Sequence, residues 1–188
     1  MDKVTKKGVT YLSATGEVID CLFCRIQNRQ EPGTIVYEDN NFVVFKTIQP
    51  ATNLHLLVTP RTHIKNVNSL KGNHGADLVR QLVDVGRKAL GESADGAQYC
   101  FHIPPLTSID HLHLHAIASP TSMGFWAAQK YRQNTFFCQS ADAIIDRLSK
   151  QKCETTSSES PAGVSDIKNR VASSGDISNS GAPPTPEI

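Results

Sequence analysis

The segment Ser108–Ile117, with the sequence SIDHLHLHAI, constrains the fold of this chain more than any other stretch. Its three histidines, His111, His113 and His115, alternate with apolar residues. Successive side chains of a β-strand point to opposite faces, so a strand places all three imidazoles on one face. A helix would spread them around its surface, because its period is 3.6 residues. The pattern therefore predicts a strand whose imidazoles can bind metal, transfer protons or act as nucleophiles.

The same alternation is also typical of a half-buried strand whose histidines only face water, but three histidines in register favour a shared chemical role. His111 to Ile117 matches in full the signature of the histidine triad family, His-φ-His-φ-His-φ-φ with φ apolar. The chain resembles this family from about residue 21 to residue 150. It is most similar to the third branch of histidine triad nucleotide-binding proteins. The residues behind this closer resemblance are Cys21-Leu22-Phe23-Cys24-Arg25-Ile26, Phe101-His102-Ile103-Pro104-Pro105, Ser108-Ile109 and Gly124-Phe125.

Composition excludes several classes of function. The chain has 188 residues and a formal net charge of +1, which gives no basic surface for bulk capture of nucleic acid or of an anionic membrane. No apolar run is long enough to span a bilayer, and residues 1–18 lack the apolar core of a secretory signal. Five cysteines, two of them spaced Cys-x-x-Cys, indicate a reducing compartment. We expect the cytoplasm, with the nucleus left open.

Three regions are predicted along the chain: a flexible arm over residues 1–18, a folded domain over 19–150, and a disordered Ser/Pro-rich tail over 151–188. The domain alternates expected strands with a helix at Asp77–Leu90, and Ser140 is expected to cap a last helix through Leu148. The expected strands are Thr34–Glu38, Phe42–Phe45, Leu54–Thr59, Tyr99–His102 and the triad strand. This order predicts an α+β domain with an antiparallel sheet. The resemblance implies five antiparallel strands, one long helix and pairing into a homodimer.

A metal site is predicted from Cys21 and Cys24, whose Cys-x-x-Cys spacing suits chelation of one zinc ion. The alternative is that both are small, buried, reduced residues. The resemblance implies His63, in Pro60-Arg61-Thr62-His63, and His111 as the other two ligands. A structural Zn²⁺ on Cys21, Cys24, His63 and His111 is therefore expected, and no organic cofactor.

The resemblance also implies a reaction, in which His113 displaces the amine from a purine nucleoside 5′-monophosphate linked through nitrogen. Water would then release AMP from the nucleotidyl-histidine. Three other residues are expected to contact the phosphate: His55 and His115 as donors, and Ser108 through its hydroxyl or backbone N–H. Thr47 stands where many relatives carry an aspartate that contacts the ribose, and threonine carries no charge.

Two other functions are left open. One is a nucleotide-binding or scaffolding protein without catalysis, which Thr47 favours mildly and the intact triad disfavours. The other is a DNA deadenylase, since the sequence also resembles aprataxin-type enzymes. Those enzymes carry a zinc finger after the catalytic domain and a basic surface for DNA, whereas residues 153–188 contain one cysteine, no histidine and more acidic than basic residues.

Overall fold

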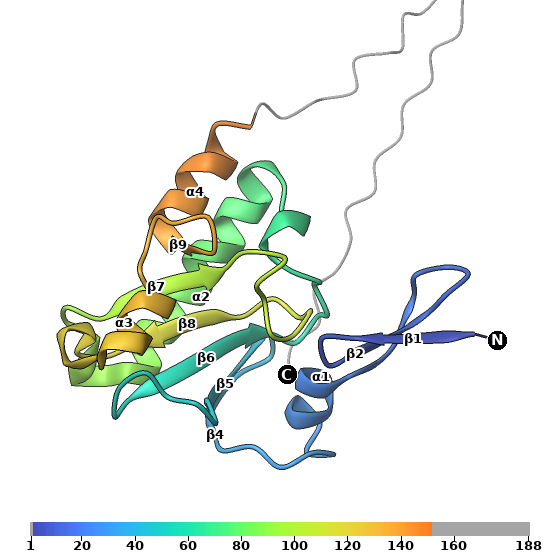
Figure 1. Cartoon of the computed structure of the whole chain (residues 1–188), viewed down its shortest axis with the longest axis horizontal. Helices are drawn as coiled ribbons and strands as arrows, with labels where there is room; N and C mark the ends of the chain where they lie inside the picture. Colours follow the sequence, from blue (N-terminus) through green and yellow to red (C-terminus); the bar gives the residue numbers. More distant parts are fainter. Residues whose placement is uncertain (1, 152–188) are drawn as a thin grey trace, which may run out of the picture. The chain divides into compact units, whose positions relative to one another are not determined.

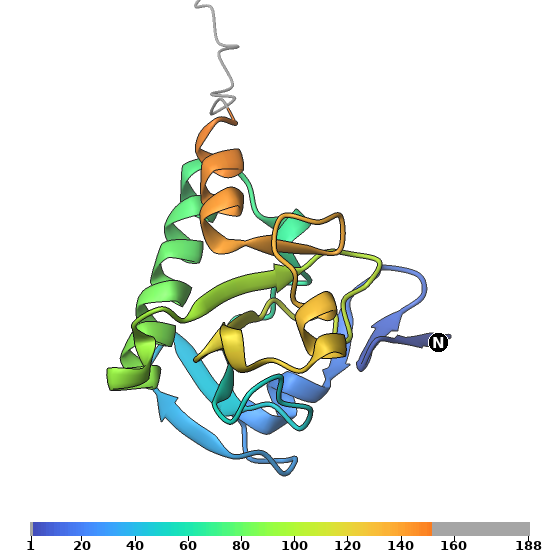
Figure 2. The ribbon, with the colours of Figure 1, turned by 60° about the vertical axis from the view of Figure 1, so that its left-hand side comes forward.

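A computed structural model describes residues 2–151, and Figures 1 and 2 show its arrangement in two views. The strands are β1 (Lys3–Lys6), β2 (Val9–Leu12), β3 (Val18–Cys21), β4 (Ile35–Glu38), β5 (Phe42–Lys46), β6 (His55–Pro60), β7 (Gln98–His102), β8 (Leu114–Ile117) and β9 (Cys138–Ser140). The α-helices are α1 (Leu22–Gln27), α2 (Gly72–Leu90), α3 (Phe125–Lys130) and α4 (Ala141–Ser149). The predicted tail lies outside the described residues, apart from its first position.

The main sheet has six strands in the order β4-β5-β6-β8-β7-β9, and its pairings are antiparallel. The α+β class with a long helix is confirmed. The strand count exceeds the expected five, because Cys138–Ser140 adds β9 to the edge of β7. A strand of three residues is too short to show the alternating pattern by which strands are recognised. The last helix begins after Ser140 as predicted, and the Ser140 hydroxyl accepts the N–H of Ala143.

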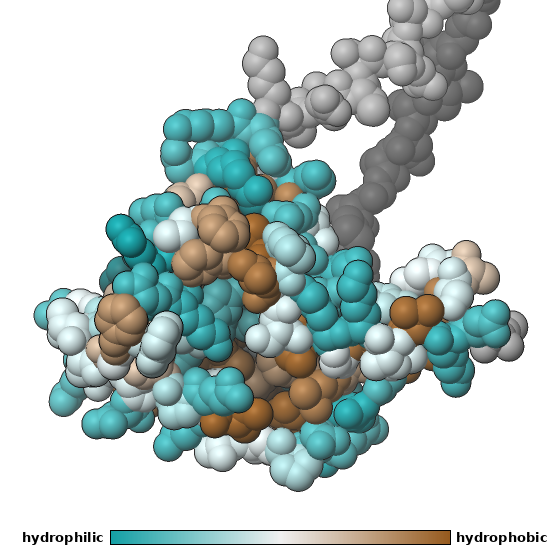
Figure 3. Space-filling view, viewed as in Figure 1, coloured by the Kyte–Doolittle hydropathy of each residue, from teal (hydrophilic) through white to brown (hydrophobic). Residues whose placement is uncertain are grey.

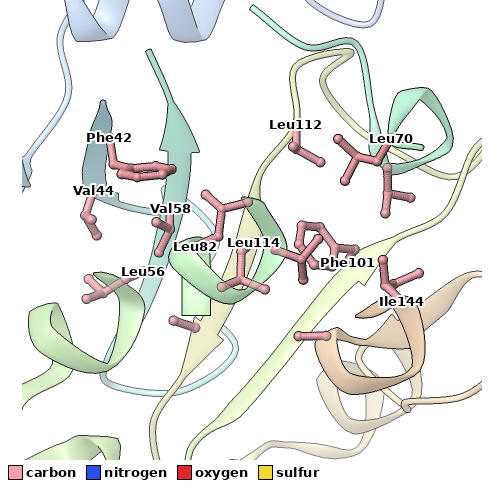
Figure 4. Packing of buried hydrophobic residues seen from close by; sticks show 14 of the residues in the cluster. Phe42, Val44, Leu56, Val58, Leu70, Leu82, Phe101, Leu112, Leu114 and Ile144 are labelled. Carbon is pink, nitrogen blue, oxygen red and sulfur yellow. The ribbon is translucent and has the colours of Figure 1, made fainter. Parts of the chain in front are cut away.

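One face of the sheet is covered by α2 and α4, which lie side by side in both views (Figures 1 and 2). Figure 4 shows strand side chains gathered around Leu82 of α2. These strand residues are Phe42, Val44, Leu56, Val58 and Leu114. Their period of two explains the arrangement, because every second residue of a strand points to the same face.

The buried face of α2 differs from the predicted one. The periodicity predicts a stripe of Leu78, Leu82, Val85 and Ala89, flanked by Val79 and Val83. The buried positions include Leu82 and Val79 but also the small residues Ala76 and Gly86. A Cβ on Gly86 would lie 3.4 Å from Ala116, Tyr99 and Val58, so the missing side chain lets the helix approach the sheet closely. Small residues such as Ala76 and Gly86 add little to the hydrophobic pattern of the sequence. The pattern therefore places the buried face of α2 at a different angle around the helix from the observed one. The helix ends as predicted at Gly91, whose φ is 57°.

Residues 1–18 are not the unstructured arm predicted from their polar composition. Lys3–Lys6 and Val9–Leu12 form a hairpin, and β3 completes a three-stranded sheet with them. β1 is exposed along its whole length, so its sequence contains no buried alternation to reveal the strand. Val9 at the start of β2 is buried with Phe23 of α1 and Phe45 of β5 in a second hydrophobic cluster.

This second cluster lies against the sheet face opposite α2, because Val43 and Phe45 alternate with the residues that face α2. The sheet is thus covered on both faces near β5 and β6. Large hydrophobic side chains also reach the surface, among them Phe125, Trp126 and Phe136. On the face seen in Figure 3, hydrophobic patches are separated by hydrophilic ones. Within residues 2–151, none of the helices combines the length and apolar character that a membrane crossing requires.

A pair of isoleucine substitutions tests where the main core lies. Ile144 of α4 is fully buried in the α2-side cluster, and Ile48 is 96% exposed. We expect Ile144→Ala to lower the free energy of unfolding by about 2–5 kcal/mol, because it removes buried methyl groups and leaves a cavity. Ile48→Ala should change it by less than about 0.5 kcal/mol. Urea unfolding measures both, and equal effects would contradict the placement of α4 against the sheet.

Candidate active site and metal centre

The three histidines of the triad lie on the sheet face away from α2, as the alternation predicts. Leu112 and Leu114 pack in the α2-side core, while the rings of His113 and His115 meet edge to face at a centroid distance of 5.0 Å on the opposite side. Phe23 of α1 covers His113, with ring centroids 5.3 Å apart. The histidines are therefore enclosed rather than exposed to solvent, and His113 is only 7% exposed.

The strand itself is shorter than predicted, since β8 begins at Leu114 and His111 and His113 precede it. The pairing of β6 with β8 ends at Val58 and Leu114. Two residues further along, Pro60 of β6 would be opposite Leu112. Proline has no N–H to donate, so this pair cannot form the usual two hydrogen bonds. The chain at His111–His113 leaves the ladder there, so its backbone groups are available for other contacts.

One such contact fixes the protonation of His113. Its Nδ1–H donates to the backbone carbonyl of His111 at 2.6 Å. A neutral imidazole has one N–H, so Nε2 carries the lone pair. Burial, the largest influence, lowers the pKa of His113 to about 4, although the bond to His111 acts in the opposite direction. His113 is thus a neutral imidazole at physiological pH, with its nucleophilic nitrogen left free.

His55 and His115 form a second hydrogen-bonded pair. The backbone N–H of Ala51 donates to Nδ1 of His55 at 3.1 Å, so the proton of His55 is on Nε2. This Nε2–H donates to Nδ1 of His115 at 2.9 Å. The proton of His115 is therefore on Nε2, which is buried and has no partner within residues 2–151. A buried donor without a partner is costly, and a negatively charged ligand oxygen would satisfy it.

Burial also keeps this pair neutral. It lowers the pKa of His55 to about 4 and that of His115 well below its ordinary value, with smaller contributions from neighbouring positive charges. The site can therefore bind negative charge through oriented N–H groups without imidazolium ions.

Two further residues lie beside these histidines, and neither was assigned a role from the sequence. The ring of His102 lies 4.6 Å from that of His115, and the Tyr131 ring lies 5.1 Å from that of His55 and 5.2 Å from that of His115. His102 could have been found from alternation on β7, because its neighbour Phe101 faces the α2-side core. Tyr131 follows the short helix α3 and gives no sequence signal.

A small cavity of about 10 Å³ adjoins His113, and His102 and Thr107 are also among its lining residues. A space of this size holds a single water molecule. The nucleoside of any bound nucleotide therefore has to lie outside it.

Ser108 and Thr47, the other two residues predicted to contact the nucleotide, differ in burial and in hydrogen bonding. Ser108 is exposed and makes no hydrogen bond within residues 2–151, whereas its neighbour Thr107 is buried. Thr47 is partly buried. It lies beside His55, since its backbone N–H donates to the His55 carbonyl at 3.4 Å. Its hydroxyl accepts the N–H of Gln49 within the turn that follows β5.

Cys21, Cys24, His63 and His111 come together as the sequence analysis predicts, with one ligand atom from each within 4.8 Å of the others. Nδ1 of His111 lies 3.4 Å from Sγ of Cys21 and 3.5 Å from Sγ of Cys24. Nδ1 of His63 lies 3.6 Å from Sγ of Cys24. These four residues could hold a metal ion.

The donor set fits zinc by three criteria. Tetrahedral ligands at ordinary Zn–S and Zn–N lengths are separated by roughly 3.3–3.8 Å, which matches the sulfur–nitrogen distances. Nε2–H of His111 donates to the carbonyl of Pro60 at 3.0 Å, which directs the Nδ1 lone pair toward the thiols. Hydrogen bonding with Cys24 lowers the pKa of Cys21, so a thiolate is available as a ligand.

Comparison with known proteins agrees with this geometry. A family model described as scavenger mRNA decapping enzyme C-term binding matches residues 20–131. The chain belongs to the histidine triad family that the fold and the site define, and it is a hydrolase of that family.

Individual relatives narrow the assignment to the third branch of histidine triad nucleotide-binding proteins. Adenosine 5′-monophosphoramidase HINT3 of Xenopus tropicalis is 36% identical over 135 residues, which cover 69% of this chain and 88% of the relative. The bifunctional adenosine 5′-phosphosulfate phosphorylase/adenylylsulfatase HINT4 of Arabidopsis thaliana is 36% identical, covering 60% and 78%. Among solved structures, a HIT family hydrolase from Clostridium thermocellum has a TM-score of 0.50 and 27% identity, covering 57% and 96%.

The neutral state of His55 makes stability depend on pH. The pKa of His55 is about 4 in the folded protein and about 6.5 in an unfolded chain, so between these values the unfolded state binds more protons. The free energy of unfolding should therefore fall as pH falls from 6.5 to 4, by at most about 1.4 kcal/mol per pH unit from this residue. Urea unfolding at several pH values in this range should show that the free energy of unfolding changes less with pH in His55→Asn than in the wild type. The exposed His74→Asn should keep the full slope, and identical slopes for all three proteins would refute the argument.

Proposed function

We propose that this protein hydrolyses nucleotide phosphoramidates, releasing AMP or another nucleoside 5′-monophosphate through a covalent intermediate on His113. The observation that carries the proposal is the bond from His113 Nδ1 to the His111 carbonyl, which leaves Nε2 unprotonated at neutral pH. A neutral imidazole nitrogen with a fixed lone pair is what attack on phosphorus requires.

In the first step, Nε2 of His113 donates its lone pair to phosphorus, and a P–N bond to histidine forms. The P–N bond to the amine breaks, and the amine leaves with the bonding electron pair and takes up a proton. In the second step, water attacks phosphorus and forms a P–O bond, and it releases a proton that balances the one taken up by the amine. The bond to His113 breaks, and its electron pair returns to Nε2. The products are the free histidine and the nucleoside monophosphate.

Negative charge that develops on the phosphoryl oxygens needs donors placed in advance. Nε2–H of His115 supplies one, because it is buried and has no partner among the described residues. His55 holds that N–H in place through its own bond to Nδ1 of His115. We propose Ser108 as a further phosphate donor and Thr47 as a nucleotide contact, consistent with the position of Ser108 just before the triad and of Thr47 beside His55.

The names of the relatives support an adenosine 5′-phosphoryl substrate. The Xenopus tropicalis relative is named an adenosine 5′-monophosphoramidase, and the Arabidopsis relative is named for adenosine 5′-phosphosulfate phosphorylase and adenylylsulfatase activity. The named activities share the adenosine 5′-phosphoryl group and differ in the group attached to it. The names of the relatives therefore indicate the nucleotide part of the substrate, and they do not indicate which amine is attached to it.

We also propose that Cys21, Cys24, His63 and His111 hold a structural zinc ion. Zinc would supply four strong bonds that join the segment before β4 to the triad and would fix the ring of His111. The carbonyl of the same residue holds Nδ1 of His113, so the orientation of the nucleophile depends on where His111 is held. Thiolate ligands need a reducing environment, which supports a cytoplasmic or nuclear location. The homodimer expected from the family stays a prediction.

Turnover of a fluorogenic AMP phosphoramidate tests the reaction. His113→Asn should lower kcat by roughly three orders of magnitude or more, because it removes the nucleophile. His115→Ala should lower kcat by about 10²–10³, because it removes an oriented donor. His74→Asn, on the exposed side of α2, should leave kcat unchanged. Acid-quenched wild-type protein should carry a nucleotidyl adduct on His113 by mass spectrometry.

Two results would contradict the proposed reaction. Tight AMP binding without turnover would indicate a nucleotide-binding protein. Preferential release of AMP from adenylated DNA would indicate a deadenylase.

Metal analysis tests the zinc site. The purified protein should contain about one zinc ion per chain, and Cys24→Ser should lose it. Cys100→Ser is the matched control, because Cys100 is buried on β7 in a different hydrophobic cluster. Cobalt substitution should give the absorption bands of a tetrahedral thiolate site in the wild type and in Cys100→Ser, and not in Cys24→Ser. A native protein that binds neither ion, with Cys21 and Cys24 fully reactive toward a thiol reagent, would refute the proposal.

A further inference from the structure

The turn between β1 and β2 touches both segments that carry the site. Lys7 and Gly8 form this turn in the left-handed region, with φ of 51° and 66°. This conformation is unusual for lysine and costs free energy unless neighbouring contacts maintain it.

The two backbone carbonyls of this turn accept bonds from different parts of the chain. The Lys7 carbonyl accepts the N–H of Asp110 at 3.1 Å, and the Gly8 carbonyl accepts the N–H of Leu22 at 3.0 Å. Asp110 precedes His111, and Leu22 follows Cys21. One tight turn therefore connects the segment of the triad with the segment of the Cys-x-x-Cys pair.

The Lys7 side chain adds a second set of contacts to the loop before the triad. Its ammonium donates to the carbonyl of Pro105 and, at 3.0 Å, to the hydroxyl of Thr107. The Thr107 hydroxyl in turn donates to Asp110 at 3.4 Å. Thr107 also lines the small cavity beside His113, so Lys7 holds one wall of that cavity.

Asp110 needs these partners, because it is only 5% exposed and makes no salt bridge within residues 2–151. A buried carboxylate is costly unless hydrogen bonds compensate for the lost water. Besides Thr107, the hydroxyl of Tyr11 in β2 donates to it at 3.4 Å. The hairpin β1–β2 thus supplies Asp110 with polar contacts as well as with a backbone acceptor.

From these contacts we infer that Lys7 is a positioning residue for the reaction at His113, a role that rests on the proposed function. Lys7 fixes the loop from Pro105 to Asp110, the loop fixes the backbone of His111, and the carbonyl of His111 orients His113. Displacement of a nucleophile by about 1 Å is enough to cost up to about 10² in rate. Substrate binding is affected less, because Lys7 contacts the loop and not the imidazoles.

Substitution of Lys7 tests this role with a matched control. Lys7→Met keeps the length of the side chain and removes its donors, and it should lower kcat by roughly tenfold or more with less than a twofold change in KM. Lys7→Arg should restore most of the activity, because the guanidinium can donate to the same two oxygens. Lys6→Met, at an exposed position in β1, should leave both constants unchanged. A purely structural role predicts a lower melting temperature with an unchanged kcat of the folded fraction.

Hydrogen exchange gives a readout that does not depend on activity. In Lys7→Met, amide exchange should quicken in the peptide that contains Asp110 and not in α2. Gly8→Ala should have the same effect, because a Cβ there would lie 2.6 Å from Cδ1 of Ile109. Gly16→Ala is its control, since Gly16 has a similar φ of 70° but nothing within 4 Å of its added Cβ.

The outcomes separate this inference from the proposed function. An active wild type, with kcat and exchange unchanged in Lys7→Met, would overturn the role of Lys7 and leave the reaction intact. A wild type without turnover would overturn the proposed reaction, and with it the catalytic part of this inference. Reduced kcat, rescue by arginine and faster exchange at Asp110 together would support it.

Discussion

One backbone carbonyl, that of His111, decides which nitrogen of His113 is free to react. It accepts Nδ1–H of His113 and leaves Nε2 as the only lone pair on that ring. The carbonyl is free of strand pairing because β8 begins only at Leu114, and the pairing of β6 with β8, which ends before Pro60, does not reach His111. The same proline accepts Nε2–H of His111 through its own carbonyl, which directs the other nitrogen of His111 toward the two thiols. The free nitrogen of His113 and the arrangement of the four Cys/His side chains are thus both determined where this ladder ends.

Burial does the remaining electrostatic work. His55, His113 and His115 all have lowered pKa values, and loss of hydration is the largest cause for each. Neutral rings can form a directional chain, in which Ala51 donates to His55 and His55 donates to His115. Among the described residues, this chain of hydrogen bonds ends in a donor without a protein partner, at the position where a phosphoryl oxygen would be bound. The enclosure by Phe23 and Tyr131 is therefore part of the chemistry as well as of the packing.

Sequence patterns predict those parts of the site that depend on alternation and spacing. Alternation around His113 and His115 gives the correct face of the sheet, and the Cys-x-x-Cys spacing with the family resemblance gives the four clustered ligands. The patterns fail where the determining residue is small or the element is short. Gly86 lies on the buried face of α2 but is not recognised by the hydrophobic pattern, and β9 has only three residues. Tyr131 reaches the histidines from a segment with no periodicity of its own.

The N-terminal hairpin shows a third limit, which concerns backbone groups. Its importance to the site lies in two carbonyls, those of Lys7 and Gly8, and carbonyls are the same for every residue type. The side-chain pattern of β1 is uniformly exposed, and it reads as an arm without structure. Only the left-handed turn has a sequence trace, in the glycine that follows a lysine. A segment that acts through its main chain leaves little record in composition, even when it stabilises the loop that aims a nucleophile. The hairpin could be placed only after the loop it contacts was known, because the bond from Asp110 crosses about a hundred residues of sequence.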